Sequence, residues 1–136
     1  CPFCTPARFP VDRVLQATEH FRLVRDDFPY QHHLEHLLII PIEHIEMEDF
    51  RRVSPAMMTE VWELLLWATE EFKLPGGGLV LRWGDPDFNA STVRHLHGHI
   101  QAPDGTGVAK ATFAKDQSPE AVAARTAKIS TFQSRP

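Results

Sequence analysis

The sequence lacks the features of a membrane or exported protein. No apolar run approaches the roughly 18 residues that a membrane-spanning helix needs, and the opening residues do not have the pattern of a signal peptide. Internal repeats and low-complexity tracts are also missing. We therefore expect a cytoplasmic protein with no membrane partner. Because the first residue is Cys1 and not Met, we expect further residues before it.

Clusters of positive charge are missing as well. The formal net charge is −4, and the Lys and Arg residues are scattered along the chain. This argues against a nucleic-acid partner but leaves small anionic ligands open. With 136 residues, 43% hydrophobic and 24% charged, the chain has the size and composition of one soluble globular domain, residues 1–136.

The hydrophobic pattern predicts an α+β fold. Ser54 and Pro55 are an N-cap and a first helical residue, and Pro75 with the glycines after it ends that helix. Trp62, inside it, is expected to face the core. A second helix is predicted over 118–130. Strands are predicted over 20–25, 37–40, 79–83, 93–102 and 108–114, with a turn at 84–87. This order indicates an antiparallel sheet packed by helices on one face.

Three histidines alternate in the segment His95-Leu96-His97-Gly98-His99. In a strand, residues two apart share one face about 7 Å from each other, so the three imidazoles are predicted to line one surface. Imidazole titrates near neutrality and can act as nucleophile, general acid or metal ligand.

The only two cysteines form a C-x-x-C pair, Cys1 and Cys4. Such a pair can be a redox motif, but that motif usually opens a helix inside a βαβ unit. Two thiolates are also half of a tetrahedral zinc site. The candidates that complete it are His44, which follows a predicted strand, and one histidine of the triad segment.

These motifs together resemble the histidine triad (HIT) superfamily of nucleotide hydrolases and nucleotidyl transferases. The segment from His36 through four apolar residues and Pro41 to His44 precedes the triad by about fifty residues, in the superfamily's order. The resemblance covers nearly the whole chain. It implies a single HIT-like domain over 1–136, Cys1–Cys4 included, with a five-stranded antiparallel sheet and two main helices, commonly paired as a homodimer.

The resemblance also implies roles for individual residues. The middle histidine, His97, is expected to attack the α-phosphorus and become nucleotidylated. His99 is expected to contact the phosphate and the leaving group, and His36 to complete the catalytic cluster. In zinc-containing members the equivalent ligands bind a structural metal; here these are Cys1, Cys4, His44 and His95.

Three further residues are assigned to the nucleotide. Thr92 stands where a Ser or Thr usually bonds the phosphate, and Asp26 near where a residue holds the ribose hydroxyls, with Asp27 as its competitor. Arg82 stands where many members have Asn. It is either a charge on a strand face or a fork-shaped phosphate donor. Ala90 and Ser91 replace a glycine–glutamine pair.

The expected function is a hydrolase that cleaves at a nucleotide α-phosphate, with phosphoramidates or dinucleoside polyphosphates as substrates. A nucleotidyl transferase or phosphorylase is the first alternative: His99 stands where related transferases have Gln, which favours hydrolysis, whereas Gly98 is typical of the transferases. The second alternative is a non-catalytic nucleotide-binding protein.

Overall fold

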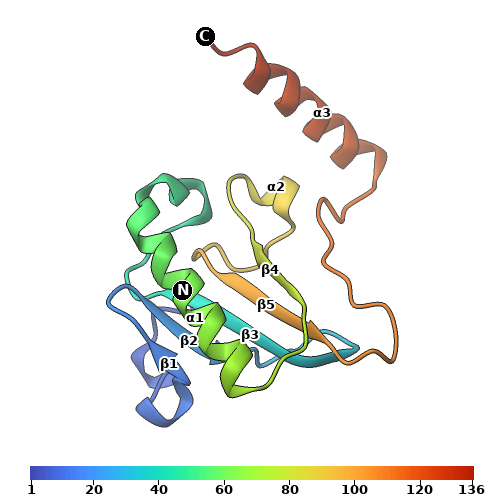
Figure 1. Cartoon of the computed structure of the whole chain (residues 1–136). Coiled ribbons are helices and arrows are strands. Elements are labelled where there is room, and N and C mark those ends of the chain that lie inside the picture. Colours follow the sequence, from blue (N-terminus) through green and yellow to red (C-terminus); the bar gives the residue numbers. More distant parts are fainter.

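A five-stranded antiparallel sheet forms the centre of the computed structural model, which describes all 136 residues (Figure 1). The strands lie in the order β1-β2-β3-β5-β4. Their bounds are Gln16–Ala17 for β1, Phe21–Arg25 for β2, His33–Pro41 for β3, Gly78–Leu81 for β4 and Gly98–Pro103 for β5. The predicted α+β class and five-stranded antiparallel sheet are confirmed.

The apolar run of β3 is buried on both faces of the sheet. Leu37 and Ile39 belong to the main core, together with side chains of the long helix α1. Leu38 and Ile40 face the other way and pack with Phe3 of the N-terminal segment. A strand covered on both faces reads as a continuous hydrophobic run, which explains why 37–40 lacks alternation.

Strand register places two histidines on the face that the N-terminal segment covers. Leu38 of β3 pairs with His99 of β5, so their side chains point to the same side. His36 lies two residues before Leu38 and therefore shares that side. The face opposite α1 is thus where the histidines meet.

Helix α1 spans Pro55–Glu71 and covers one face of the sheet (Figure 1). Its N-cap is as predicted, because the Ser54 hydroxyl accepts a hydrogen bond from the Met57 N–H at 3.2 Å. The prediction that Trp62 faces the core is wrong, since this side chain is 57% exposed. The buried stripe runs at helical spacing through neighbouring positions instead, namely Val61, Leu64 and Ala68.

The predicted triad strand is shorter than expected. β5 begins at Gly98, so only His99 lies in it, while His95 forms an isolated antiparallel bridge with Glu46. His97 lies between the two. The prediction that one continuous strand face carries all three imidazoles is therefore wrong in detail, although the His97 and His99 rings still lie 4.9 Å apart. The predicted turn at 84–87 leads into the short helix α2, Pro86–Asn89.

The segment after β5 also differs from expectation. No strand forms over 108–114, because this stretch bonds to loops and side chains rather than to a sheet edge. Helix α3, Pro119–Gln133, forms as predicted and is capped by Ser118. It projects from the body in Figure 1 and buries no residue, so α1 alone packs on the sheet.

Three short 3-10 helices complete the chain, at Pro6–Arg8, Val11–Arg13 and Met47–Arg52. None of the helices is long and apolar enough to cross a membrane.

Candidate active site and metal centre

A cavity of about 320 Å³ opens on the face of the sheet opposite α1. Its lining includes His97, His99, Asp26, Thr92 and Arg82. His99 lies in β5, Asp26 directly follows β2, Arg82 directly follows β4, and the other two belong to the loop before β5. The volume is near the lower end of the range for small-molecule sites. Residues that are distant in the sequence and that were predicted to act together therefore share one pocket.

His97 is held in one tautomer by the backbone. Its Nδ1 lies 2.8 Å from the carbonyl oxygen of His95, and a carbonyl only accepts, so Nδ1 carries the proton. Nε2 therefore keeps its lone pair. Burial lowers the pKa of His97, which keeps the ring neutral. Phe3 packs edge-on against the ring with centroids 5.1 Å apart. A buried, neutral and oriented imidazole has the properties of a nucleophile.

His36 and His99 form a hydrogen-bond chain with a defined direction. The Tyr30 N–H donates to Nδ1 of His36 at 3.1 Å, so His36 carries its proton on Nε2. That Nε2–H donates to Nδ1 of His99 at 2.8 Å. His99 must then carry its own proton on Nε2. Burial, followed by the neighbouring His97 and His36, lowers the pKa of His99 to about 3, so the ring is neutral.

Asp26 joins the hydrogen-bond chain of His36 and His99, and Asp27 does not. Oδ2 of Asp26 lies 3.4 Å from Nε2 of His36, while Oδ1 accepts the Phe28 N–H at 2.9 Å. Asp26, His36 and His99 are close enough to hold a metal ion. However, Nδ1 of His36 already accepts a hydrogen bond from the Tyr30 N–H, so its Nε2 is a donor rather than a ligand. We therefore interpret this group as a proton relay.

Asp27 is occupied by two arginines. Arg8 contacts it at 3.0 Å and Arg13 forms a second ion pair with it. The hydrogen bond from Arg13 is the main reason why the pKa of Asp27 is lowered. Of the two acidic candidates in the sequence, only Asp26 faces the histidines, and its predicted contact with the ribose hydroxyls stays a prediction.

Arg82 is a buried cation, only 4% exposed. Its Nη1 donates to the carbonyl oxygens of Asn89 and Thr112, the second at 2.6 Å. Its guanidinium carbon lies 4.4 Å from the centre of the Phe113 ring. No carboxylate pairs with it, and it lines the cavity. Arg82 is thus a buried cation at the pocket and not an exposed charge. Its contact with a phosphate stays a prediction.

Two neighbouring residues in the loop before the triad, Ser91 and Thr92, differ in their hydrogen bonding. The Ser91 hydroxyl donates to the Val93 carbonyl at 2.9 Å and is therefore used within the loop. Thr92 makes no hydrogen bond of its own and lines the cavity. Asn89 is buried and shapes this loop, because its amide donates to the Trp83 carbonyl and its oxygen accepts the Ser91 N–H. Of the two hydroxyls, that of Thr92 is thus the one without a protein partner, and its contact with a phosphate stays a prediction.

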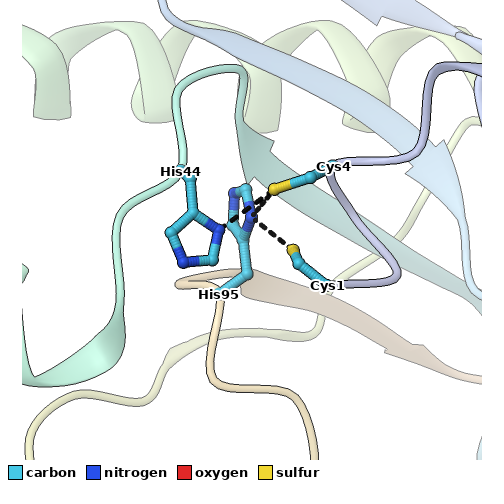
Figure 2. Close-up of side chains that lie close together, drawn as sticks. All are labelled: Cys1, Cys4, His44 and His95. Carbon is cyan, nitrogen blue, oxygen red and sulfur yellow. Dashed lines mark hydrogen bonds between the residues drawn. The ribbon is translucent and has the colours of Figure 1, made fainter.

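A second group brings together Cys1, Cys4, His44 and His95 (Figure 2). Nδ1 of His95 lies 3.3 Å from the Cys1 sulfur and 3.4 Å from the Cys4 sulfur. Nδ1 of His44 lies 3.0 Å from the Cys4 sulfur. Four N and S donors at these separations can hold one metal ion, and two thiols with two imidazoles are ligands that zinc accepts.

The outer contacts of this group orient its ligand nitrogens. Nε2 of His95 donates to the Pro41 carbonyl at 2.9 Å, so Nδ1 keeps the lone pair that a metal needs. Nε2 of His44 lies 3.5 Å from a Glu46 carboxylate oxygen, the usual outer partner of a metal-binding histidine. Burial lowers the pKa of His95 to about 4, which keeps the ligand unprotonated. The donor types and their grouping therefore fit a metal ion.

Comparisons with known proteins identify the fold. The sequence matches no protein-family model and no curated protein. Among solved structures, one described as a HIT-like protein is 28% identical, with 67% of this chain and 85% of that chain covered and a TM-score of 0.54. A HIT family hydrolase from Clostridium thermocellum is 23% identical, covering 80% and 95%, with a TM-score of 0.62. A zinc-bound histidine triad family protein from Mycobacterium smegmatis is 22% identical, covering 98% and 96%, with a TM-score of 0.58.

The chain therefore has the fold of the histidine triad proteins. Its triad is divided between two sites. His95 lies with Cys1, Cys4 and His44 in what we call the metal group, while His97 and His99 line the cavity. The HIT resemblance found in the sequence is thereby confirmed at the level of the fold. The roles of the individual residues are a separate matter and are proposed below.

Sequence analysis did not identify three residues that shape this site. The Tyr30 backbone fixes His36, Phe3 packs on both His95 and His97, and Asn89 builds the loop before the triad. A backbone donor leaves no mark in the residue type, so Tyr30 gave no signal. Phe3 stands between the two cysteines. Of the three residues, it is the one whose burial beside a pair of metal ligands a sequence pattern can suggest.

Proposed function

We propose that this HIT protein is a nucleotide hydrolase that cleaves at the α-phosphate through a nucleotidyl intermediate on His97. The observation that carries the proposal is the hydrogen bond from Nδ1 of His97 to the His95 carbonyl. It leaves a neutral nitrogen, Nε2, with a free lone pair on a ring that lines a substrate-sized cavity. A binding module has no need of such a nucleophile.

In the first step Nε2 of His97 attacks the α-phosphorus. A P–N bond forms, and the bond from phosphorus to the leaving group breaks with its electron pair going to that group. Negative charge grows on the phosphoryl oxygens. The Arg82 guanidinium and the Thr92 hydroxyl line the same cavity and supply donors for it. Neither donor has to leave a carboxylate partner to do so.

The histidine chain supplies the proton. In the tautomers assigned above, His99 presents an N–H at Nε2. Negative charge on the bound substrate favours protonation of this ring from solvent, and the imidazolium then gives its Nε2 proton to the departing amine. Water then attacks the phosphorus of the intermediate, and the P–N bond breaks with its electrons returning to Nε2. The nucleotide is released, and the proton that the water loses restores His99.

Two alternatives use the same pocket. If phosphate replaces water in the second step, the protein is a phosphorylase or nucleotidyl transferase. If no intermediate forms, it is a nucleotide-binding protein. His99 in place of the transferase Gln favours hydrolysis, and the structural neighbour from Clostridium thermocellum is described as a hydrolase.

The metal group is proposed to be a structural zinc site. With four protein ligands, Cys1, Cys4, His44 and His95, no open position remains for a substrate or a reacting water. The metal would tie the N-terminal segment to the sheet. It would not take part in the reaction itself.

Several broader expectations accompany this function. We propose a single catalytic domain over 1–136, a homodimer, and a cytoplasmic location. The substrate is a small nucleotide, and no nucleic-acid or membrane partner is proposed. The homodimer is testable by light scattering, since a monomer mass at every micromolar concentration would contradict it.

The experiment that tests the function is a substrate panel. Purified protein is incubated with nucleoside phosphoramidates and dinucleoside polyphosphates, with and without inorganic phosphate. Nucleoside monophosphate formed without phosphate supports hydrolysis. Nucleoside diphosphate formed only with phosphate assigns a phosphorylase, and binding without turnover leaves the non-catalytic alternative.

A further inference from the structure

The cavity is lined by more cations than anions, although the whole chain has a formal net charge of −4. Its cationic lining residues are Arg8, Arg13, Arg25, Arg82 and Lys115, and its carboxylates are Asp26 and Asp27. Positive charge gathered in a concave site attracts anionic ligands. The question is which of these cations remain free to bind one.

Three of the arginines already have carboxylate partners. Arg8 and Arg13 share Asp27, and Arg25 pairs with Glu35 at 3.3 Å. Arg82 and Lys115 have none. Arg82 is buried against carbonyl oxygens and the face of Phe113, which do not neutralise a charge. A buried cation without an anion is costly unless a ligand supplies the negative charge.

The segment that carries Lys115 is fixed by Arg82. The guanidinium of Arg82 bonds the Thr112 carbonyl and lies over Phe113, and the Ala114 N–H donates to the Phe88 carbonyl at 2.9 Å. These contacts hold residues 112–114 beside the cavity. The next residue, Lys115, is exposed and lines the cavity. The two cations without a carboxylate partner thus line the same cavity, Arg82 buried and Lys115 exposed.

We propose that Lys115 binds a phosphate of the leaving group, so that the site selects nucleotides whose α-phosphate is linked to further phosphates. This inference rests on the function proposed above. Arg82 would meet the α-phosphate beside His97, and Lys115 the phosphates that leave. When the P–N bond to His97 forms, the bridging P–O bond breaks and its electrons stay on the departing oxygen. The Lys115 ammonium offsets that charge, so this leaving group needs no proton.

A phosphoramidate makes the opposite demand. Its leaving group is an amine that must take up a proton, and it has no phosphate for Lys115 to contact. An exposed cation in the cavity lining therefore favours the polyphosphate over the phosphoramidate. Lys115 is a specificity residue of this chain, and the two substrate classes distinguish it from a residue with a general role.

The test compares Lys115→Met with Lys110→Met. The control removes the same charge from the same segment, and Lys110 does not line the cavity. The probes are diadenosine tetraphosphate and an adenosine 5′-phosphoramidate. We expect Lys115→Met to lower kcat/KM for the tetraphosphate about tenfold, as the loss of a charged hydrogen bond does. Its effect on the phosphoramidate, and both effects of Lys110→Met, should stay within about twofold.

Other outcomes would overturn the inference in separate ways. An equal loss on both substrates, or no loss on either, removes Lys115 as the specificity residue. If the unaltered protein cleaves only the phosphoramidate, the polyphosphate preference is wrong and the proposed hydrolase function stands. If it turns over neither probe nor any other nucleotide of the panel, the proposed function itself fails.

Discussion

The carbonyl oxygen of His95 accepts the Nδ1–H of His97 at 2.8 Å, so a residue of the metal group orients the candidate nucleophile. Phe3 strengthens this link because it packs edge-on against both rings, at 5.7 Å from His95 and 5.1 Å from His97. The two sites are therefore neighbours in one packed unit. Four predictions follow from this arrangement and from the relay beside it.

Replacing His97 by Ala should lower turnover by several orders of magnitude while the affinity for nucleotide changes little. The lost interaction exists only along the reaction path, whereas contacts to the base and ribose lie elsewhere. Single-turnover kinetics measures the first effect and equilibrium binding the second. Mass spectrometry of the unaltered protein with substrate should find a nucleotidyl adduct on the peptide that contains His97.

The matched control is His20→Ala. His20 is exposed, bonds Glu60 at 2.6 Å and does not line the cavity, so activity should be retained. Near-normal turnover in His97→Ala, or an adduct on another histidine, would show that the nucleophile is assigned wrongly.

Replacing His99 by Ala should have a milder effect that depends on the leaving group. General acid catalysis contributes about 10²–10⁴-fold, and only a leaving group that needs a proton loses all of it. We expect a large loss for an alkylamine phosphoramidate and a small one for an ester of a nitrophenol. The measurement is kcat/KM for both compounds. Equal losses would contradict the role of His99 as the proton donor.

Removing the metal should first affect stability and then catalysis. Purified protein should contain one zinc per chain, and Cys4→Ser should lose it, because a thiolate ligand is replaced by a weak one. Binding energy at a structural site is folding energy, so the melting temperature should fall. Turnover should fall less than in His97→Ala, because the His95 carbonyl becomes less well placed but His97 remains. Elemental analysis and calorimetry provide the readouts.

An unaltered zinc content in Cys4→Ser, or no metal in protein purified without chelators, would remove this site. Asp12→Asn is a useful companion variant, since it changes an exposed residue in the same N-terminal segment but none of the four ligands. Its zinc content should be unchanged.

The buried histidines should make stability depend on pH in the acidic range. Burial lowers the pKa values of His36 and His99, the latter to about 3, whereas in the unfolded chain both have the ordinary value near 6.5. The unfolded state therefore binds more protons as pH falls below about 6.5, and the free energy of unfolding decreases towards pH 3. The slope is at most about 1.4 kcal/mol per pH unit for each group.

Comparing the unaltered protein with His99→Gln isolates one of these groups. The variant removes one titrating ring, so its unfolding free energy should fall less steeply between pH 6.5 and 4.5, by up to about 1.4 kcal/mol per pH unit. Loss of metal in acid affects both proteins and cancels in the difference. Parallel curves from urea unfolding would mean that His99 does not keep a lowered pKa.

Local patterns in the chain were enough to predict the fold class and the residue types of both sites. The apolar run at 37–40, the capped helix that begins at Pro55 and the alternating histidines are local patterns, and local patterns follow from backbone geometry. Resemblance to the HIT superfamily added the grouping of Cys1, Cys4, His44 and His95, which the structure brings together. The prediction for Trp62 was wrong because helical spacing shows that one side of the helix is apolar but does not show how wide the buried part of that side is.

The environment of each of those residues depends on tertiary contacts. Whether Arg82 is buried, whether Asp26 or Asp27 faces the histidines, and which hydroxyl is free depend on contacts between distant segments. The direction of the relay depends on the backbone N–H of Tyr30, a donor that every residue type except proline provides. A sequence records which groups can donate and accept. Only packing, which brings a particular donor within 3.1 Å of a particular nitrogen, selects the tautomer and with it the chemistry.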